Sequence, residues 1–117
     1  MAYCVIVDNP KGSAELYQQV LQRVLASGDM PPEGAIFQVA GPAEGGWRVI
    51  TVWESREAQE RFRDERLIPA FNELGVSRDE VRWSDFDVHS VLAGDLSAAT
   101  QPASAGEDIA HAASASG

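Results

Sequence analysis

The sequence has very few residues of the kinds that build covalent or metal-bound frameworks. Its 117 residues include a single cysteine, Cys4, and two histidines. One cysteine excludes an internal disulfide and a metal cluster built from thiolates. It also suits a reducing compartment, and we therefore expect the protein to be cytoplasmic.

Long apolar runs and basic residues are scarce as well. No apolar run is long enough to cross a bilayer, and no basic residue precedes the short apolar run near Cys4, so we expect neither a membrane span nor a secretory signal. Nine Lys and Arg residues stand against eighteen Asp and Glu residues, which gives a formal net charge of -9. An acidic surface repels phosphate backbones, so we expect no nucleic-acid partner.

The motifs of common cofactor and hydrolase sites are missing. Gly45 and Gly46 lie in an expected hairpin and not between a strand and a helix, so they do not form a phosphate-binding loop. The sequence contains no nucleophile elbow. We therefore predict no phosphate cofactor and no serine hydrolase chemistry.

What is present is the composition of one globular domain. Hydrophobic residues make up 44% of the chain and charged residues 23%. We predict a single folded domain over residues 1–94. From about Leu96 the sequence consists almost entirely of small and polar residues, which bury too little surface to offset their ordering entropy. Residues 95–117 are therefore predicted to be a disordered Ala/Ser/Gly-rich tail.

Turn-forming residues divide the folded part into four predicted strands, at residues 3–7, 36–39, 47–53 and 81–92. The second and third strands are joined by a short turn-rich segment, which predicts an antiparallel hairpin.

Two helices are predicted between these strands. The first begins after Ser13 as N-cap and ends near Gly28, and the second begins after Ser55, is divided by Pro69 and ends at Gly75. The resulting order is strand, helix, strand, strand, helix, strand. This βαββαβ order is typical of the ferredoxin-like α+β fold with a four-stranded antiparallel sheet.

The predicted strands at 3–7 and 47–53 carry apolar side chains on both faces. Two helices cover only one face of such a sheet, whereas a half-solvated strand should alternate apolar with polar residues. We therefore expect a second copy of the chain to cover the other face in a twofold homodimer. The alternative is that the bare face is small enough to remain exposed.

One segment also carries a family resemblance. Residues 45–55, GGWRVITVWES, form a strand that runs directly into a capped helix, and residues 61–71, RFRDERLIPAF, follow. With this segment, residues 3–92 resemble the dimeric α/β-barrel superfamily, in particular the antibiotic biosynthesis monooxygenase group and uncharacterised actinobacterial relatives.

The resemblance implies a dimeric α/β barrel with a ligand cavity between helices and sheet, and with Tyr3, Val5 and Val7 facing the helices. In the monooxygenase group the deprotonated substrate reduces dioxygen itself, so the resemblance implies no cofactor. The superfamily also contains haem-degrading enzymes. Their catalytic residues fall here on Val5, Phe62 and Asn72, none of which can repeat that chemistry.

Candidate catalytic residues lie in the last predicted strand. His89 is the only histidine of the folded part and titrates near neutrality, and Asp87 shares its strand face and can orient it. Arg82, like Arg48, falls inside a strand and can polarise a substrate oxygen or pair with a carboxylate. The structural alternatives are a solvated His89 and a salt bridge at each arginine.

The alternation of Asp85, Asp87 and His89 uses the residue types of metal ligands. Residues four apart on a strand lie roughly 13 Å from each other, too far to share one ion. At most an adjacent pair can chelate, and we predict no metal site.

Large aromatic side chains are numerous for so short a fold and can bind a flat substrate or simply pack the core. The candidate substrate-binding residues are Tyr3, Tyr17, Trp47, Trp53, Phe62 and Trp83.

Three functional hypotheses follow, and the weakest of them is an oligomer-forming accessory domain. The first is a small cofactor-independent enzyme, monooxygenase-like or cyclase-like, that acts on an aromatic or polyketide-type molecule. The second is a non-catalytic small-molecule-binding or interaction protein that uses the same dimeric barrel. An enzyme needs an ionisable group in its cavity, whereas a binding protein needs only aromatic walls.

Overall fold

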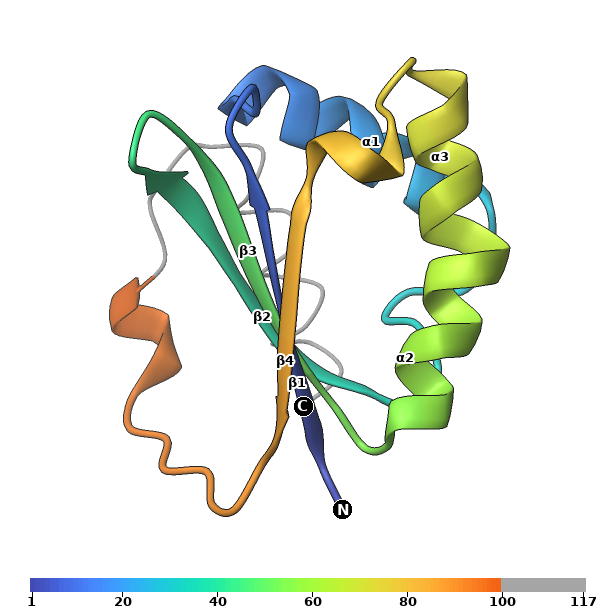
Figure 1. Ribbon diagram of the computed structural model, residues 1–117. Coiled ribbons are helices and arrows are strands. Elements are labelled where there is room, and N and C mark those ends of the chain that lie inside the picture. The colour runs from blue at the N-terminus through green and yellow to red at the C-terminus, as the bar shows by residue number, and fades with distance from the viewer. Residues whose placement is uncertain (100–117) are drawn as a thin grey trace.

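Four antiparallel strands form one sheet whose helices lie on a single face (Figure 1). The computed structural model describes residues 1–99. The strands are β1 (Tyr3–Asn9), β2 (Ala35–Ala43), β3 (Gly46–Trp53) and β4 (Arg82–Asp87), and their order across the sheet is β2-β3-β1-β4. The sequence of elements is βαββαβ, so the predicted ferredoxin-like α+β fold is confirmed.

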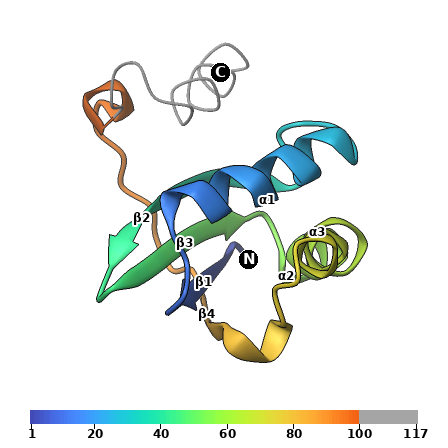
Figure 2. The ribbon, with the colours of Figure 1, turned by 90° about the horizontal axis from the view of Figure 1, so that it is seen from above.

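The helices begin where the sequence places their caps. Helix α1 (Ala14–Ala26) starts after Ser13, whose hydroxyl accepts the Leu16 N–H, and α2 (Arg56–Phe62) starts after Ser55, whose hydroxyl accepts the Ala58 N–H. Figure 2 shows α1 and α2 beside each other on the same side of the sheet.

A π-helical turn (Arg63–Leu67) joins α2 to α3 (Ile68–Glu73). Pro69 has no N–H, so it cannot donate the i to i−4 hydrogen bond of an α-helix. The Ile68 N–H donates to the Arg63 carbonyl, five residues earlier, which is the pattern of a π-helix. The predicted division of the second helix at Pro69 therefore takes the form of a π turn. Gly75, in the left-handed region with φ 72°, ends α3 as predicted.

The helix-facing side of the sheet contains the apolar core. Phe71, Val76 and Val81 are buried together, with Val7 and Trp83 packed against them. Because alternate residues share a face, Tyr3, Val5 and Val7 all point toward the helices, as the resemblance implied.

The opposite face of the sheet is apolar, and no α-helix of residues 1–99 covers it. It carries alternate residues of all four strands, namely Cys4, Ile6, Phe37, Val39, Ile50, Val52 and Phe86. Cys4 and Val52 are buried at its centre, whereas Phe37, Val39 and Phe86 are 38%, 50% and 53% exposed. We call this set the open face. Its apolar character matches the two-faced strands seen in the sequence.

At one end of the open face, Arg48 has a partner within its own chain. Its Nε lies 2.6 Å from Asp8 Oδ1, and its Nη2 lies 3.3 Å from Asp8 Oδ2. Asp8 and Arg48 face each other across β1 and β3, so the pair is a cross-strand salt bridge. The hydrogen bond and the charge of Asp8 raise the pKa of Arg48.

The last strand is shorter than predicted. β4 ends at Asp87, not at residue 92. Among the described strands β4 has one neighbour, β1, and Asp87 pairs with Tyr3, the first residue of β1, so β4 ends where its partner strand begins. The Val88 N–H still donates to the Ala2 carbonyl at 2.8 Å, and the residues after it leave the sheet.

The predicted tail lies mostly outside the described residues. Residues 100–117 are not described, and Leu96–Ala99 forms a short 3-10 turn on the side of the sheet away from α2 and α3 (Figure 1). Among the described residues, no helix is both long enough and apolar enough to cross a membrane.

Two glycines of the β2–β3 hairpin, one tightly packed and one not, allow the packing of the hairpin to be tested with a matched pair of substitutions. A Cβ on Gly46 would lie 2.2 Å from the carbonyl oxygen of Asn9 and 2.8 Å from Cα of Pro10, both backbone atoms, whereas a Cβ on Gly41 meets nothing within 4 Å. We expect Gly46→Ala to lower the free energy of unfolding by about 2 kcal/mol or more. Gly41→Ala should leave it within ~0.5 kcal/mol of wild type. Urea unfolding followed by circular dichroism tests this, and equal effects of the two substitutions would contradict it.

Candidate ligand-binding pocket between the helices and the sheet

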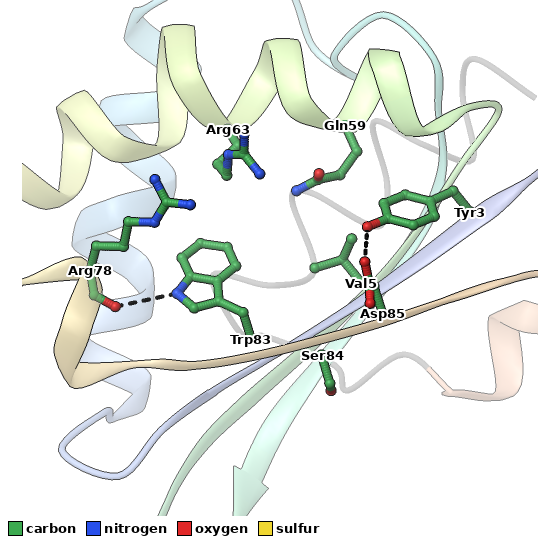
Figure 3. A pocket seen from close by; sticks show the side chains of 8 residues that line it. All are labelled: Tyr3, Val5, Gln59, Arg63, Arg78, Trp83, Ser84 and Asp85. Atoms are coloured by element: carbon green, nitrogen blue, oxygen red, sulfur yellow. Dashed lines mark hydrogen bonds between the residues drawn. The ribbon is translucent and has the colours of Figure 1, made fainter.

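A pocket of about 130 Å³ lies between β1 and β4 on one side and α2 with its π turn on the other (Figure 3). Eight residues line it: Tyr3, Val5, Gln59, Arg63, Arg78, Trp83, Ser84 and Asp85. Arg78 and Asp85 are exposed, so the pocket is open to solvent beside the edge strand β4. This is the position between helices and sheet that the resemblance implied.

One end of the pocket is formed by Tyr3 and Asp85. Tyr3 is only 5% exposed, and its hydroxyl donates a hydrogen bond to Oδ2 of Asp85 (Figure 3). The two residues are diagonal neighbours on one face of adjacent strands, since Val5 pairs with Asp85 and Tyr3 with Asp87.

The environment of Tyr3 keeps its hydroxyl protonated. Burial, then the hydrogen bond to Asp85 and the charge of that carboxylate, raise the pKa of Tyr3 to about 12. The guanidinium of Arg56 lies 4.7 Å from the ring centre and opposes this shift. At neutral pH Tyr3 is therefore a hydrogen-bond donor to Asp85.

Gln59 and Arg63 reach into the pocket from the helix above the sheet (Figure 3). Gln59 is 4% exposed, the one buried polar residue of the described chain, and Arg63 follows one helical turn later at the start of the π turn. Arg63 Nε and Nη2 lie 2.8 and 3.3 Å from the two carboxylate oxygens of Asp64, and the hydrogen bonding lowers the pKa of Asp64. Nη1 of Arg63 takes no part in this pair.

The other end of the pocket is aromatic and basic. The indole of Trp83 stands on β4, its Nε1 donates to the Arg78 carbonyl at 3.3 Å, and its ring centre lies 6.3 Å from that of Phe71. The Arg78 guanidinium lies 5.9 Å from the Trp83 ring. In Figure 3 this end lies across the pocket from the pair formed by Tyr3 and Asp85.

The arrangement brings together the parts of an acid–base site. Asp85 supplies a carboxylate next to a protonated phenol, Gln59 supplies an amide, and Arg63 and Arg78 supply positive charge. These groups suit a ligand that gives up a proton at one end and carries negative charge elsewhere. Among residues 1–99, no group of three His, Cys, Asp or Glu side chains is placed to hold a metal ion.

Only two of the predicted aromatic residues line this pocket, Tyr3 and Trp83. Trp53 is 2% exposed, and its ring centre lies 5.1 Å from that of Phe62. Phe62 lines a separate hollow of about 460 Å³ between α2 and the loop that follows α1.

Tyr17 and Trp47 pack together elsewhere, under α1, with ring centres 5.5 Å apart. The Tyr17 hydroxyl donates to Oε1 of Gln38. The predicted aromatic set therefore occupies three separate places between the helices and the sheet.

The predicted catalytic residues are not brought together. His89 is exposed and lies beyond the end of β4, so it does not share a strand with Asp87. Asp87 is exposed at the last position of β4, and Arg82 is exposed on the opposite face from Trp83. None of the three lines the pocket.

Six of the eight pocket residues were not predicted as site residues, namely Val5, Gln59, Arg63, Arg78, Ser84 and Asp85. For Gln59 the sequence holds a signal, because it precedes Phe62 by three residues and therefore shares the helix face of an expected core residue. Asp85 alternates with Asp87 and was noted only as a metal-ligand type. Arg78 belongs to a short 3-10 turn (Arg78–Glu80), and nothing in the local sequence marks its direction.

The two tyrosines permit a direct test of the Tyr3 environment. In a Tyr17→Phe protein, Tyr3 is the only phenol, and we expect its ionisation, followed by absorbance near 295 nm, to have a midpoint of about 12. Adding Asp85→Asn should move the midpoint downward, because it removes a charge that opposes ionisation. Far-UV circular dichroism must show that the fold survives at each pH. A midpoint near 10 in the Tyr17→Phe protein, with the fold intact, would contradict the proposed burial and hydrogen bond.

The same shift sets a direction for stability in alkali. Because the folded pKa of Tyr3 lies above its unfolded value, the stability linked to Tyr3 is fully present below pH 10 and is lost as pH rises toward 12. The Tyr3→Phe protein should therefore lose less stability than wild type over this range, as measured by urea unfolding.

Comparison with known proteins finds similarity in structure only. No family model matches the sequence, and no curated protein matches it. The solved structure of SnoaB, a cofactor-independent oxygenase from Streptomyces nogalater, matches with a TM-score of 0.55 and 16% identity over 80% of this chain and 97% of that one.

Two other solved structures illustrate the range of these similarities. A candidate antibiotic biosynthesis monooxygenase from Deinococcus radiodurans matches with a TM-score of 0.50 and 16% identity, over 80% of this chain and 97% of that one. A dimeric ferredoxin-like protein of unknown function from Jannaschia sp. CCS1 matches with a TM-score of 0.52 and 10% identity, over 75% and 100%. At such identities the likeness establishes the fold alone: the chain has a ferredoxin-like fold, and its structural neighbours include a cofactor-independent oxygenase and a candidate antibiotic biosynthesis monooxygenase.

Proposed function

We propose that this protein is a small cofactor-independent enzyme, monooxygenase-like or cyclase-like, that acts on an aromatic or polyketide-type molecule in the pocket between helices and sheet. The observation that carries the proposal is the pair formed by Tyr3 and Asp85, which faces the same pocket as Gln59 and Arg63. A carboxylate held by a protonated phenol, beside an amide and a guanidinium, is a combination suited to removing a proton and stabilising the resulting anion.

The first step is removal of a proton from the substrate. Asp85 accepts this proton on its carboxylate, while the Tyr3 hydroxyl holds the carboxylate in place and stays protonated because of its raised pKa. The negative charge left on the substrate spreads to an oxygen that Nη1 of Arg63 and the amide of Gln59 can stabilise. Trp83 and Val5 provide apolar walls for the ring.

The second step distinguishes the two reaction classes. In a monooxygenase, the carbanion gives two electrons to dioxygen and forms a C–O bond, and the resulting peroxide anion takes back the proton held by Asp85 to become a hydroperoxide. The hydroperoxide then loses water, so that CH₂ and O₂ become C=O and H₂O. In a cyclase, the carbanion attacks a carbonyl of the same molecule, and the C–C bond forms without dioxygen. Neither route needs a bound cofactor, and the likeness to a cofactor-independent oxygenase supports the first.

We also propose that the protein is a homodimer whose copies meet through the open face. Seven apolar side chains lie there without a covering helix from the described part of the chain, and a structural neighbour is described as dimeric. The single cysteine remains the support for a cytoplasmic location.

The catalytic proposal is tested by comparing Asp85→Asn with His89→Ala. With a panel of hydroxylated benzenes, naphthalenes and anthracenes as probes, we expect oxygen uptake or product formation to fall at least about a hundredfold in Asp85→Asn. His89→Ala tests the predicted role of His89, which lies outside the pocket. Glu57→Gln, on the exposed side of α2, is the control.

Each outcome of this comparison has a meaning. Full activity of Asp85→Asn together with loss of activity in His89→Ala would return the catalytic role to His89. Ligand binding by wild type without any turnover, with or without air, would favour the non-catalytic binding protein.

The dimer is tested on two exposed aliphatic residues. Val39 is 50% exposed on the open face, and Leu25 is 41% exposed on α1. We expect Val39→Asp to convert the protein to single chains, because it places an unpaired charge in an apolar interface, and Leu25→Asp to leave the dimer intact. Light scattering at micromolar concentration measures this. Single, stably folded wild-type chains would contradict the dimer.

A further inference from the structure

We infer that the pocket selects a single-ring hydroxyaromatic acid, with its hydroxyl at the Tyr3–Asp85 end and its carboxylate at the end formed by Arg78 and Arg63. The inference concerns the ligand of the same pocket and so rests on the proposed function. It follows from the charges at the two ends, the aromatic wall and the size of the cavity.

The basic end of the pocket stands out against the charge of the chain. The formal net charge is -9, yet two of the nine Lys and Arg residues, Arg63 and Arg78, line this pocket. An overall acidic protein that gathers arginines at one pocket favours an anionic group there.

Arg78 supplies most of the available positive charge. Within the described part of the chain, no carboxylate lies within ion-pair distance of Arg78, whereas Arg63 is already paired with Asp64. Arg63 still has Nη1 for a further hydrogen bond. A planar ligand carboxylate between the two arginines pairs with the positive charge of Arg78 and accepts hydrogen bonds from N–H groups of both side chains.

The end of the pocket formed by Tyr3 and Asp85 excludes the carboxylate of the ligand. Asp85 is a carboxylate whose Oδ2 already accepts the hydroxyl of Tyr3, and a ligand carboxylate placed there would meet like charge. A ligand hydroxyl instead donates a hydrogen bond to the remaining oxygen of Asp85. Charge alone therefore fixes the orientation of a ligand that has one hydroxyl and one carboxylate.

The middle of the pocket limits the ligand to about one ring. Trp83 and Val5 supply an apolar wall between the two ends. The cavity of about 130 Å³ is well below the roughly 300–1,000 Å³ of pockets that enclose drug-sized ligands. A fused polycyclic molecule would have to open the pocket, whereas a single substituted ring need not.

The experiment uses calorimetric titration of the full-length protein with 4-hydroxybenzoate, its methyl ester and benzoate. We expect 4-hydroxybenzoate to bind about tenfold or more tightly than the ester, which lacks the charge, and than benzoate, which lacks the hydroxyl. Arg78→Gln should remove the preference over the ester, and Asp85→Asn should reduce the preference over benzoate. Arg61→Gln, on α2 but outside this pocket, should change neither preference. Circular dichroism verifies that each variant is folded.

The outcomes separate this inference from the proposed function, because binding needs no turnover. Equal binding of acid and ester, or an unchanged preference in Arg78→Gln, overturns the inference. If polycyclic hydroxyaromatics bind and react while 4-hydroxybenzoate does not bind, the ligand class is wrong and the proposed function stands. If no compound binds and none is turned over, both fail.

Discussion

The register of β1 between β3 and β4 controls the two surfaces on which the functional argument depends. β1 is central, so each of its side chains has a neighbour on both sides: Tyr3 pairs with Trp53 on one strand and with Asp87 on the other. This register places Tyr3 diagonally from Asp85 on the helix side and puts Cys4 between Val52 and Phe86 on the open face. A slip of one residue would exchange the faces and remove both the pocket pair and the apolar patch.

Polar groups buried between the helices and the sheet lower the stability of the fold, and packing contacts alone do not compensate for this loss. Burying an amide without full hydrogen bonding costs about 1–3 kcal/mol in proteins, and burying an unpaired charged group costs more. Gln59 is buried over the pocket, and Arg63 reaches into it at the start of a π turn, a feature often found at functional sites. An apolar residue in place of Gln59 would fill the space at less cost. The presence of Gln59 therefore argues for a bound ligand more strongly than the aromatic residues do, because aromatic packing is expected in any core.

The fold could be predicted from the sequence because its signals are local. Ser13 and Ser55 mark helix starts by capping chemistry, and Gly75 marks a helix end by its positive φ. The length of β4 could not be predicted in this way, since strand character continues to residue 92. What ends β4 is the end of its neighbour β1, and that is a property of pairing between distant segments.

The same distinction explains the site. Tyr3 and Trp83 could be predicted as pocket residues, because large aromatics are conspicuous in a short chain. Asp85 and Arg63 could not, because their role depends on which strand and helix lie opposite them. His89 looked catalytic by residue type alone, and the early end of β4 leaves it outside the pocket.

Strand β4 connects the pocket with the open face. Trp83 and Asp85 point to the helix side, while Ser84 points away from it and Phe86 is an exposed member of the open face (Figure 3). As an edge strand, β4 is held in the sheet by β1 alone. A partner packed on Phe86 would hold this strand from its second face and thereby fix the carboxylate that Tyr3 contacts. In such an arrangement the pocket stays open beside β4, because the mouth of the pocket and the open face lie on opposite sides of the sheet. Dimer formation would therefore stabilise the site without closing it.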